Sequence, residues 1–380
     1  MKIAIVTTGD EIMSGNVVDT NSAWIADKCW MLGHEVVWHG GVGDYKEGIG
    51  DACVLASERA EIVFVSGGLG ATLDDITLES AAAAFGKKMI GGKPLENKVG
   101  TAPGVQVKLG KAVFFFLPGV PRELYQIFED SILPLLKEMA GGGIYRQKFL
   151  RCFGLPEASL DERLKGLDFG GVRVSFRVTY PEVKIKLVAR KEKTVTGDKW
   201  LVISEAEKKI RERIGDYVFG VDDETMEAAA GNLLKKKKMT IAVAESCTGG
   251  YISNLITNVA GSSEWFERGV ISYSNKSKME ILGVKAETIK KYGAVSEECT
   301  REMAEGVLKI SGAGIGLSVT GVAGPSGGTE GKPVGTVHIA LATHDETRHI
   351  SCCHPRTREQ FKMLTAYEAL DMVRRKCLSA

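Results

Sequence analysis

A serine lies between a short apolar run and two glycines at residues 239–250. The run 239–243 contains β-branched residues and predicts a buried strand, while 251–256 has the apolar spacing of a helix. Ser246 would therefore occupy a strand-to-helix turn, at the sheet edge where α/β proteins bind ligands. It could be a nucleophile, and the N–H groups that begin the helix could hold negative charge. The alternative is that Ser246 is simply a helix N-cap.

Two more polar segments, 268–278 and 319–337, each follow a predicted strand. Hydrolysis of a carboxamide needs a nucleophile, a base and donors for the oxyanion. None of the three segments contains histidine, so a Ser-His-Asp triad is unsupported. A buried lysine can act as the base and a tyrosine can relay the proton, which directs attention to Lys278 and Tyr273. Cys247 is the rival nucleophile, because a helix start can activate a thiolate.

These three segments together resemble the carboxyl-terminal domain of the CinA family, from about Glu224 to Leu370. The resemblance implies an amidohydrolase that converts nicotinamide mononucleotide to nicotinate mononucleotide and ammonia in pyridine nucleotide recycling. It implies a serine acyl-enzyme and no cofactor in that step. It assigns catalysis to Ser246, Tyr273 and Lys278, and substrate binding to Thr248, Gly249, Gly250, Gly321, Gly324, Arg356 and Arg358. Which glycine loop holds the phosphate and which the oxyanion stays open.

The first part of the chain alternates strand-like and helix-like stretches: 3–6, 22–32, 35–38, 49–60 and 62–65. This alternation predicts βαβ units and a mostly parallel sheet with helices on both faces. The connecting loops are rich in glycine and acidic residues. Glycine lets backbone N–H groups approach a phosphate, and carboxylates suit Mg²⁺. Plain turns are the alternative for each loop taken alone.

This region resembles the amino-terminal domain of CinA proteins, which is similar to molybdopterin-binding domains. The resemblance implies a metal-dependent ADP-ribose pyrophosphatase. The matching nucleotide-binding positions are Glu11, Asp19, Asn21, Gly67, Gly68, Gly70, Thr72 and Asp74, and the metal-site positions are Asp44 and Asp75. The structural alternative is that Asp19, Asp44 and Asp75 cap the helices that follow them.

The first domain departs from its family in one respect. A basic helical segment with an Asn-Arg-Lys-Gln-Ala signature usually precedes the Gly-Thr-Ala-Pro-Gly motif, and here 81–93 leads almost directly into Gly100–Gly104. Ala71 also stands where proline is usual. Loss of the basic segment should weaken pyrophosphate binding. The domain could therefore be a second enzyme that hydrolyses ADP-ribose or a non-catalytic nucleotide- or pterin-binding scaffold.

Residues 146–221 suggest a small β-α-β-β-α unit that resembles the KH-like middle domain of CinA proteins. Its segment 183–190 alternates apolar and mostly basic side chains, as a half-buried strand does. There is no Gly-x-x-Gly clamp, so a solvated basic face is favoured over RNA binding. The predicted domains are 1–143, 146–221 and 224–380, with a linker at Gly141–Gly143.

Composition points to small-molecule partners. A net charge of +1 over 380 residues gives no broad footprint for nucleic acid, and no apolar run is long enough for a membrane span. Eight cysteines without a CxxC pair favour reduced thiols in a cytoplasm. A homodimer is expected.

Histidines and cysteines gather near residues 344–354. The segment predicts a strand hairpin turning at Asp345-Glu346, with His344 opposite His349. The adjacent Cys352 and Cys353 would then face opposite sides of the sheet, which argues against a zinc site formed by both.

Overall fold

The computed structural model describes residues 1–379 except 71, 73–74, 89–90, 140–145 and 190–198, and it divides into two compact units. The first unit comprises residues 1–147 with 188–202, and the second comprises 148–187 with 203–380. The predicted linker Gly141–Gly143 lies outside the described residues. Most of the predicted middle domain thus belongs to the same compact unit as the carboxyl-terminal domain.

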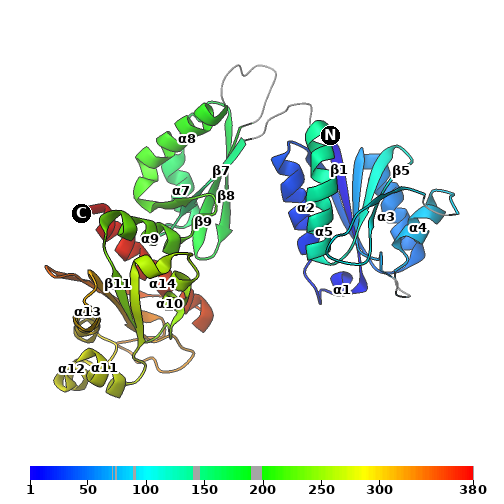
Figure 1. Ribbon diagram of the computed structural model, residues 1–380. Coiled ribbons are helices and arrows are strands. Elements are labelled where there is room, and N and C mark those ends of the chain that lie inside the picture. The colour runs from blue at the N-terminus through cyan, green and yellow to red at the C-terminus, as the bar shows by residue number, and fades with distance from the viewer. Residues whose placement is uncertain (71, 73–74, 89–90, 140–145, 190–198, 380) are drawn as a thin grey trace. The chain divides into compact units, whose positions relative to one another are not determined.

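A six-stranded sheet in the order β2-β1-β3-β6-β5-β4 forms the centre of the first unit (Figure 1). Its strands are β1 (Lys2–Thr8), β2 (Glu35–Val42), β3 (Ile62–Ser66), β4 (Lys93–Leu95), β5 (Gly104–Leu109) and β6 (Ala112–Leu117). Strands β2, β1, β3 and β6 run parallel, and β5 and β4 pair antiparallel at one edge. The predicted mostly parallel sheet is confirmed.

Helices cover both faces of this sheet. They are α1 (Asp10–Met13), α2 (Thr20–Met31), α3 (Lys46–Arg59), α4 (Thr77–Ala84), α5 (Pro121–Ile127) and α6 (Leu133–Met139), with a π-helical turn at Phe128–Ile132. Ile25 of α2 and Leu124 of α5 are buried on one face, whereas Ile49 of α3 and Ala81 of α4 are buried on the other. The fold is therefore doubly wound, and its ligand edge lies at the carboxyl ends of β1, β3 and β6.

The segment after the first domain forms a four-stranded sheet in the order β10-β7-β9-β8. Its elements are β7 (Arg146–Cys152), α7 (Glu157–Leu164), β8 (Val172–Thr179), β9 (Glu182–Ala189), α8 (Lys199–Ile214) and β10 (Val218–Val221). The predicted β-α-β-β-α order is present, and β10 is an additional strand. Val183, Ile185 and Leu187 are buried on β9, as the alternation indicated.

The carboxyl-terminal part contains a five-stranded sheet in the order β12-β11-β13-β14-β15. Its strands are β11 (Ile241–Glu245), β12 (Phe266–Ile271), β13 (Ile315–Gly321), β14 (Thr336–Ala342) and β15 (Thr347–Cys353). Strand β11 runs parallel to both β12 and β13, and β14 and β15 add antiparallel pairs. Three parallel strands therefore end at the same edge.

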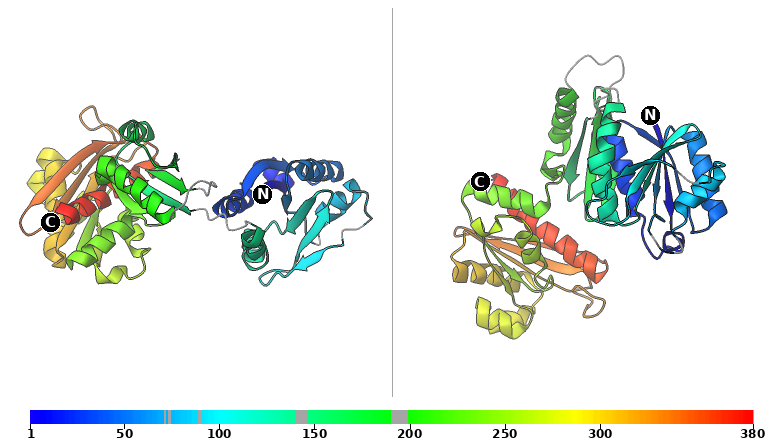
Figure 2. Two further views of the ribbon diagram at one scale, coloured as in Figure 1. Left: turned by 90° about the horizontal axis from the view of Figure 1, so that it is seen from above. Right: turned by 45° about the vertical axis from the view of Figure 1, so that its right-hand side comes forward.

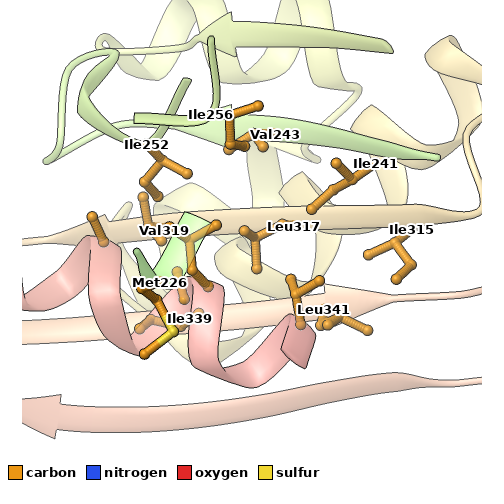
Figure 3. Packing of buried hydrophobic residues seen from close by; sticks show 14 of the residues in the cluster. Met226, Ile241, Val243, Ile252, Ile256, Ile315, Leu317, Val319, Ile339 and Leu341 are labelled. Atoms are coloured by element: carbon orange, nitrogen blue, oxygen red, sulfur yellow. The ribbon is translucent and has the colours of Figure 1, made fainter. Parts of the chain in front are cut away.

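Two helical layers enclose this sheet, which gives an α/β/α arrangement. The helices are α9 (Met226–Lys237), α10 (Tyr251–Thr257), α11 (Asn275–Leu282), α12 (Ala286–Tyr292), α13 (Glu297–Ser311) and α14 (Arg358–Ser379). Helices α9, α10 and α14 pack against the face shown in Figure 3, where Val243, Leu317 and Ile339 point to Met226 and its neighbours. On the other face, Leu282 of α11 and Met303 of α13 pack against Ala242. Figure 2 shows α14 in red against the sheet.

The boundary near Glu224 is crossed by many side-chain contacts. Phe153 and Phe219 belong to the same hydrophobic cluster as Met226, and their rings lie 5.5 and 6.3 Å from that of Tyr367. Arg374 donates to the carbonyl oxygen of Asp216 at 2.7 Å. The predicted boundary between 221 and 224 therefore does not separate two independent cores, and the polar residues at 222–224 give no sign of the buried aromatic residues before them.

The predicted hairpin is present between β14 and β15, with its turn at Thr343–Glu346. His344 lies within the turn, and the strand partner of His349 is Ala340. The predicted pairing of His344 with His349 is wrong, since the register places His338 beside His349, with their ring nitrogens 3.0 Å apart.

Candidate functional site

Ser246 occupies the predicted turn at the end of β11. Every residue of β11 is buried, and the Ser246 N–H donates to the Val319 carbonyl at 3.1 Å, which extends the pairing with β13 by one residue. Gly249 and Gly250 then adopt φ angles of 61° and 95°. These values favour glycine, and they turn the chain sharply into α10. The serine side chain is thereby fixed at the edge where β11, β12 and β13 end.

Lys278 reaches Ser246 from the neighbouring strand connection. A capping box between Ser274 and Ser277 starts α11 directly after β12, so that the first turn of α11 points the lysine back toward the sheet edge. Its Nζ lies 2.9 Å from Oγ of Ser246, 2.7 Å from the Ser272 carbonyl oxygen and 3.4 Å from the Tyr273 carbonyl oxygen. The structure therefore brings together two of the three predicted catalytic residues through their functional atoms.

Burial makes the charged form of Lys278 less favourable than it is in water. The side chain is 1% exposed, and burial lowers the pKa of this amine. A neutral amine has two N–H groups and one lone pair. Nζ donates to the Ser246 hydroxyl and to the two carbonyl oxygens, and once the amine has lost a proton its lone pair can accept the proton of the Ser246 hydroxyl. This arrangement suits a lysine that removes a proton from serine.

Glu245 is a buried acid that the sequence reasoning left without a role. It is fully buried, and its carboxylate accepts hydrogen bonds from the N–H groups of Gly250, Ile252 and Ser253 and from the Ser253 hydroxyl, at 2.7–3.1 Å. These donors at the start of α10 were expected to hold an anion of the substrate, and the protein uses them internally instead. In the sequence, this role of Glu245 is indicated only by its position as an acidic residue at the end of an otherwise apolar strand.

The residues after Ser246 have distinct environments. Burial raises the pKa of Cys247 to about 12, so this thiol is protonated near neutral pH and is a poor nucleophile. Thr248 is fully buried, and among the described residues its hydroxyl oxygen has no hydrogen-bond partner. An unpaired buried hydroxyl beside a nucleophile is available to donate to an oxyanion.

Tyr273 points away from the catalytic pair. Its side chain is 61% exposed, and its hydroxyl accepts a hydrogen bond from Arg358 at 3.1 Å. Arg358 also donates to the Gly324 carbonyl at 2.9 Å, so it ties the second and third motifs to the start of α14. Arg356 is exposed, and its backbone N–H donates to His354. Of the two candidate arginines, Arg358 is the one in contact with the predicted loops.

Packing accounts for the two glycines predicted to bind substrate in the third motif. A Cβ atom on Gly321 would lie 2.6 Å from the Thr336 carbonyl oxygen, and one on Gly324 would lie 2.4 Å from a Val334 methyl group. Gly324 also has a φ of 72°. Lys362 was not foreseen as part of this region, yet its ammonium nitrogen would lie 3.8 Å from a Cβ on Gly249. It places a second cation of α14 beside the Ser246 turn.

A cavity of about 420 Å³ lies at the carboxyl edge of the sheet in the first unit. Predicted residues contribute much of its lining: Glu11, Asp44, Gly67, Gly68, Gly70 and Asp75. Asp19 and Asn21 instead line an adjoining cavity of about 100 Å³, which Glu11 also lines. Asp74 lies outside the described residues. The loops after β1, β3 and β6 thus converge on one side, as the sheet topology required.

The acidic residues of these two cavities differ in their local roles. Asp19 caps α2 through the Ser22 N–H and accepts from the Thr7 hydroxyl, which is the structural alternative noted for it. Burial acts to raise the pKa of Asp75, but hydrogen bonds from the N–H and hydroxyl groups of Thr72 lower it overall. Asp44 and Asp75 therefore present carboxylates to one cavity, which fits the one or two carboxylates that Mg²⁺ takes in proteins.

Comparison with known proteins gives one family over the whole chain. Residues 223–377 match the CinA C-terminal domain, residues 4–138 a probable molybdopterin binding domain, and residues 147–220 the damage-inducible protein CinA KH domain. A CinA-like protein from Desulfosudis oleivorans is 38% identical over 98% of this chain and 99% of its own. The chain belongs to the CinA family.

Two other CinA relatives illustrate the range of similarity. A putative competence-damage inducible protein from Thermoanaerobacter pseudethanolicus is 36% identical over 100% of this chain and 99% of its own. The crystal structure of a competence damage-inducible protein A from Klebsiella pneumoniae is 33% identical over 40% of this chain and 94% of its own, with a TM-score of 0.39. The alignment with the Desulfosudis CinA-like protein extends over 412 positions, so that relative has residues this 380-residue chain lacks.

Proposed function

We propose that this CinA protein is an amidohydrolase that deamidates nicotinamide mononucleotide to nicotinate mononucleotide and ammonia. The observation that supports it most directly is the 2.9 Å contact between Lys278 Nζ and Ser246 Oγ, with the lysine buried and its pKa lowered. Acyl transfer requires a nucleophile in contact with a base, and a lowered pKa brings the lysine closer to the range in which it can act as that base.

The reaction follows from the positions of these two groups. Neutral Lys278 takes the hydroxyl proton as Ser246 Oγ bonds to the amide carbon. The resulting ammonium returns the proton to the nitrogen as the C–N bond breaks, and ammonia leaves. A water molecule, deprotonated by the same lysine, then attacks the carbonyl carbon of the acyl-enzyme. The ester C–O bond to Ser246 breaks, the lysine ammonium gives its proton to Ser246 Oγ, and the carboxylic acid leaves. Lysine ends each half-reaction in its starting form.

The distribution of charge suggests which groups bind each end of the substrate. The N–H groups at the start of α10 are taken by the Glu245 carboxylate, which would also repel a phosphate. Arg358 and Lys362 lie on the α14 side of the site, and Arg358 makes its hydrogen bonds to uncharged groups. We therefore assign the phosphate to these two cations and the oxyanion to the Thr248 region.

The first unit supports a second candidate function. The cavity of about 420 Å³ is lined by the glycine loops and by Asp44 and Asp75, which is the composition expected of a site for a phosphate-bearing nucleotide or pterin. A divalent ion such as Mg²⁺ held there would neutralise phosphate oxygens. Hydrolysis of ADP-ribose and non-catalytic binding are both compatible with this cavity.

Ammonia release from nicotinamide mononucleotide tests the amidohydrolase. Ser246→Ala should lower the rate by on the order of 10⁴–10⁶-fold, as loss of a covalent nucleophile does, while nucleotide binding persists. Cys247→Ala is the matched control, because the Cys247 thiol next to Ser246 is protonated and should not contribute to the reaction. If Ser246→Ala retains its rate and Cys247→Ala loses it, the serine mechanism is replaced by a thiol mechanism.

A further inference from the structure

Three metal-ligating side chains meet on the second unit outside the Ser246 site. They are Cys352 at the end of β15, His354 just beyond it and Glu368 on α14, and their ligand atoms all lie within 4.8 Å of one another. None of the three has a role in the proposed amidohydrolase. Cys352 and His354 stand close together in the sequence, whereas Glu368 is distant from both and belongs to another element.

The extended backbone explains why two of these side chains share a side. Residues two apart in a strand point the same way, and the N–H of His354 donates to the Gly335 carbonyl at 2.9 Å, so chain pairing continues past the end of β15. Cys353, between them, is exposed, whereas Cys352 packs against the hydrophobic cluster under α14. Helix α14 then supplies Glu368 opposite the pair.

The separation between His354 and Glu368 is close to the edge length of a coordination tetrahedron. His354 Nε2 lies 3.1 Å from Glu368 Oε1. With Zn–N and Zn–O bonds of about 2.0–2.2 Å, tetrahedral geometry places two such ligand atoms about 3.3–3.6 Å apart. The observed spacing therefore leaves room for an ion after only a small adjustment.

The polar atoms of the cluster lack ordinary partners. His354 Nε2 and Glu368 Oε2 are shielded from solvent, and neither has a hydrogen-bond partner among the described residues. The 3.1 Å contact between His354 and Glu368 is close enough for an ion pair but is not aligned as a hydrogen bond. Buried polar atoms without hydrogen-bond partners are uncommon in folded proteins, and an ion bound between these two atoms would give both of them a partner.

We propose that Cys352, His354 and Glu368 bind one divalent transition-metal ion, with Zn²⁺ as the best match to a thiolate, an imidazole and a carboxylate. Cys352 and Glu368 also line a cavity of about 680 Å³. The ion's fourth coordination position would face this cavity and could take water or a small ligand, as in zinc sites that have only three protein ligands.

Cobalt titration of the full-length, chelator-stripped protein tests the site. Co²⁺ bound by a thiolate gives a sulfur-to-metal charge-transfer absorption, which the carboxylates of the first unit cannot produce. Wild type should develop this absorption with one Co²⁺ per chain, and Zn²⁺ should abolish it. Cys353→Ser is the matched control and should behave as wild type, whereas Cys352→Ser should lose the absorption. Glu368→Gln, with the thiol intact, should bind at least about tenfold more weakly.

Two outcomes would overturn the proposal. One is the absence of a saturable thiolate absorption in wild type. The other is an absorption that persists in Cys352→Ser or disappears only in Cys353→Ser. Circular dichroism of each variant distinguishes loss of a ligand from loss of the fold. Ser246→Ala should bind Co²⁺ as wild type does, which separates this test from that of the amidohydrolase.

Discussion

The two candidate sites of this CinA protein keep their charged groups in different environments. Lys278 is 1% exposed and already contacts Ser246, whereas Asp44 and Asp75 are only half-buried around a cavity of about 420 Å³. In the second unit, folding has brought the reacting groups together before any substrate arrives. In the first, a ligand and an ion would have to complete the arrangement. Substitutions should therefore affect mainly rate in the second unit and mainly affinity in the first.

Lys278→Met removes the base from the assembled pair and should have the largest effect among the changes considered next. General base catalysis contributes about 10²–10⁴-fold, so kcat for ammonia release should fall by that factor. Lys276→Met is the control, because Lys276 is exposed on the same helix and pairs with the exposed Glu280. Equal rates for wild type and Lys278→Met would show that burial of this lysine serves structure alone.

The pH dependence follows from the lowered pKa of Lys278. Below that pKa the neutral fraction, and with it kcat, should fall about tenfold per pH unit. The same shift affects stability. Between the lowered pKa and the usual value near 10.5 the unfolded chain binds more protons than the folded one, so stability due to this group rises with pH. Denaturant titrations across this window should show that contribution in wild type and its absence in Lys278→Met.

Asp75→Ala tests the open site of the first unit. Calorimetry with ADP-ribose should show binding that depends on Mg²⁺ and weakens about tenfold in the variant, as removal of a group that supports a metal site does. Asp51→Ala, an exposed position on α3, serves as the control. Ammonia release should be unchanged in both variants. If ADP-ribose binds equally well in the presence of EDTA, the first unit does not use a metal ion to bind it.

Tyr273→Phe should have the smallest effect. The hydroxyl is exposed and accepts one hydrogen bond from Arg358, so its loss should raise KM about threefold, in line with the ~0.5–1 kcal/mol of such a bond, and leave kcat nearly unchanged. A large fall in kcat would instead mean that Tyr273 turns inward with substrate bound and relays the proton, as the family resemblance suggested.

The parts of these sites that depend on sheet topology could be predicted from sequence. The ends of parallel strands meet at one edge, so the loops carrying Ser246, Ser272 and Gly324 were expected to lie together. Side-chain direction could not be predicted in the same way. The motif that correctly offered Lys278 also offered Tyr273, and only the start of α11 at Asn275 decides that one points inward and the other outward.

Residues whose roles depend on tertiary burial were the ones missed. Glu245 has meaning only once α10 begins beside it and presents unpaired N–H groups to its carboxylate. Glu368 joins Cys352 and His354 only because α14 crosses the end of β15. In both cases the partners come from segments whose relative placement is not encoded in local spacing.

The last helix also constrains the order in which the protein can form during synthesis. Helix α14 contributes Phe361, Ala366, Leu370 and Val373 to the same core that buries Phe153 and Phe219. That core is therefore incomplete until codons 358–379 have been translated and the helix has left the ribosome, whereas residues 1–147 have emerged long before. A ribosome stalled near codon 350 should carry a protease-resistant first unit followed by a chain that proteases readily digest.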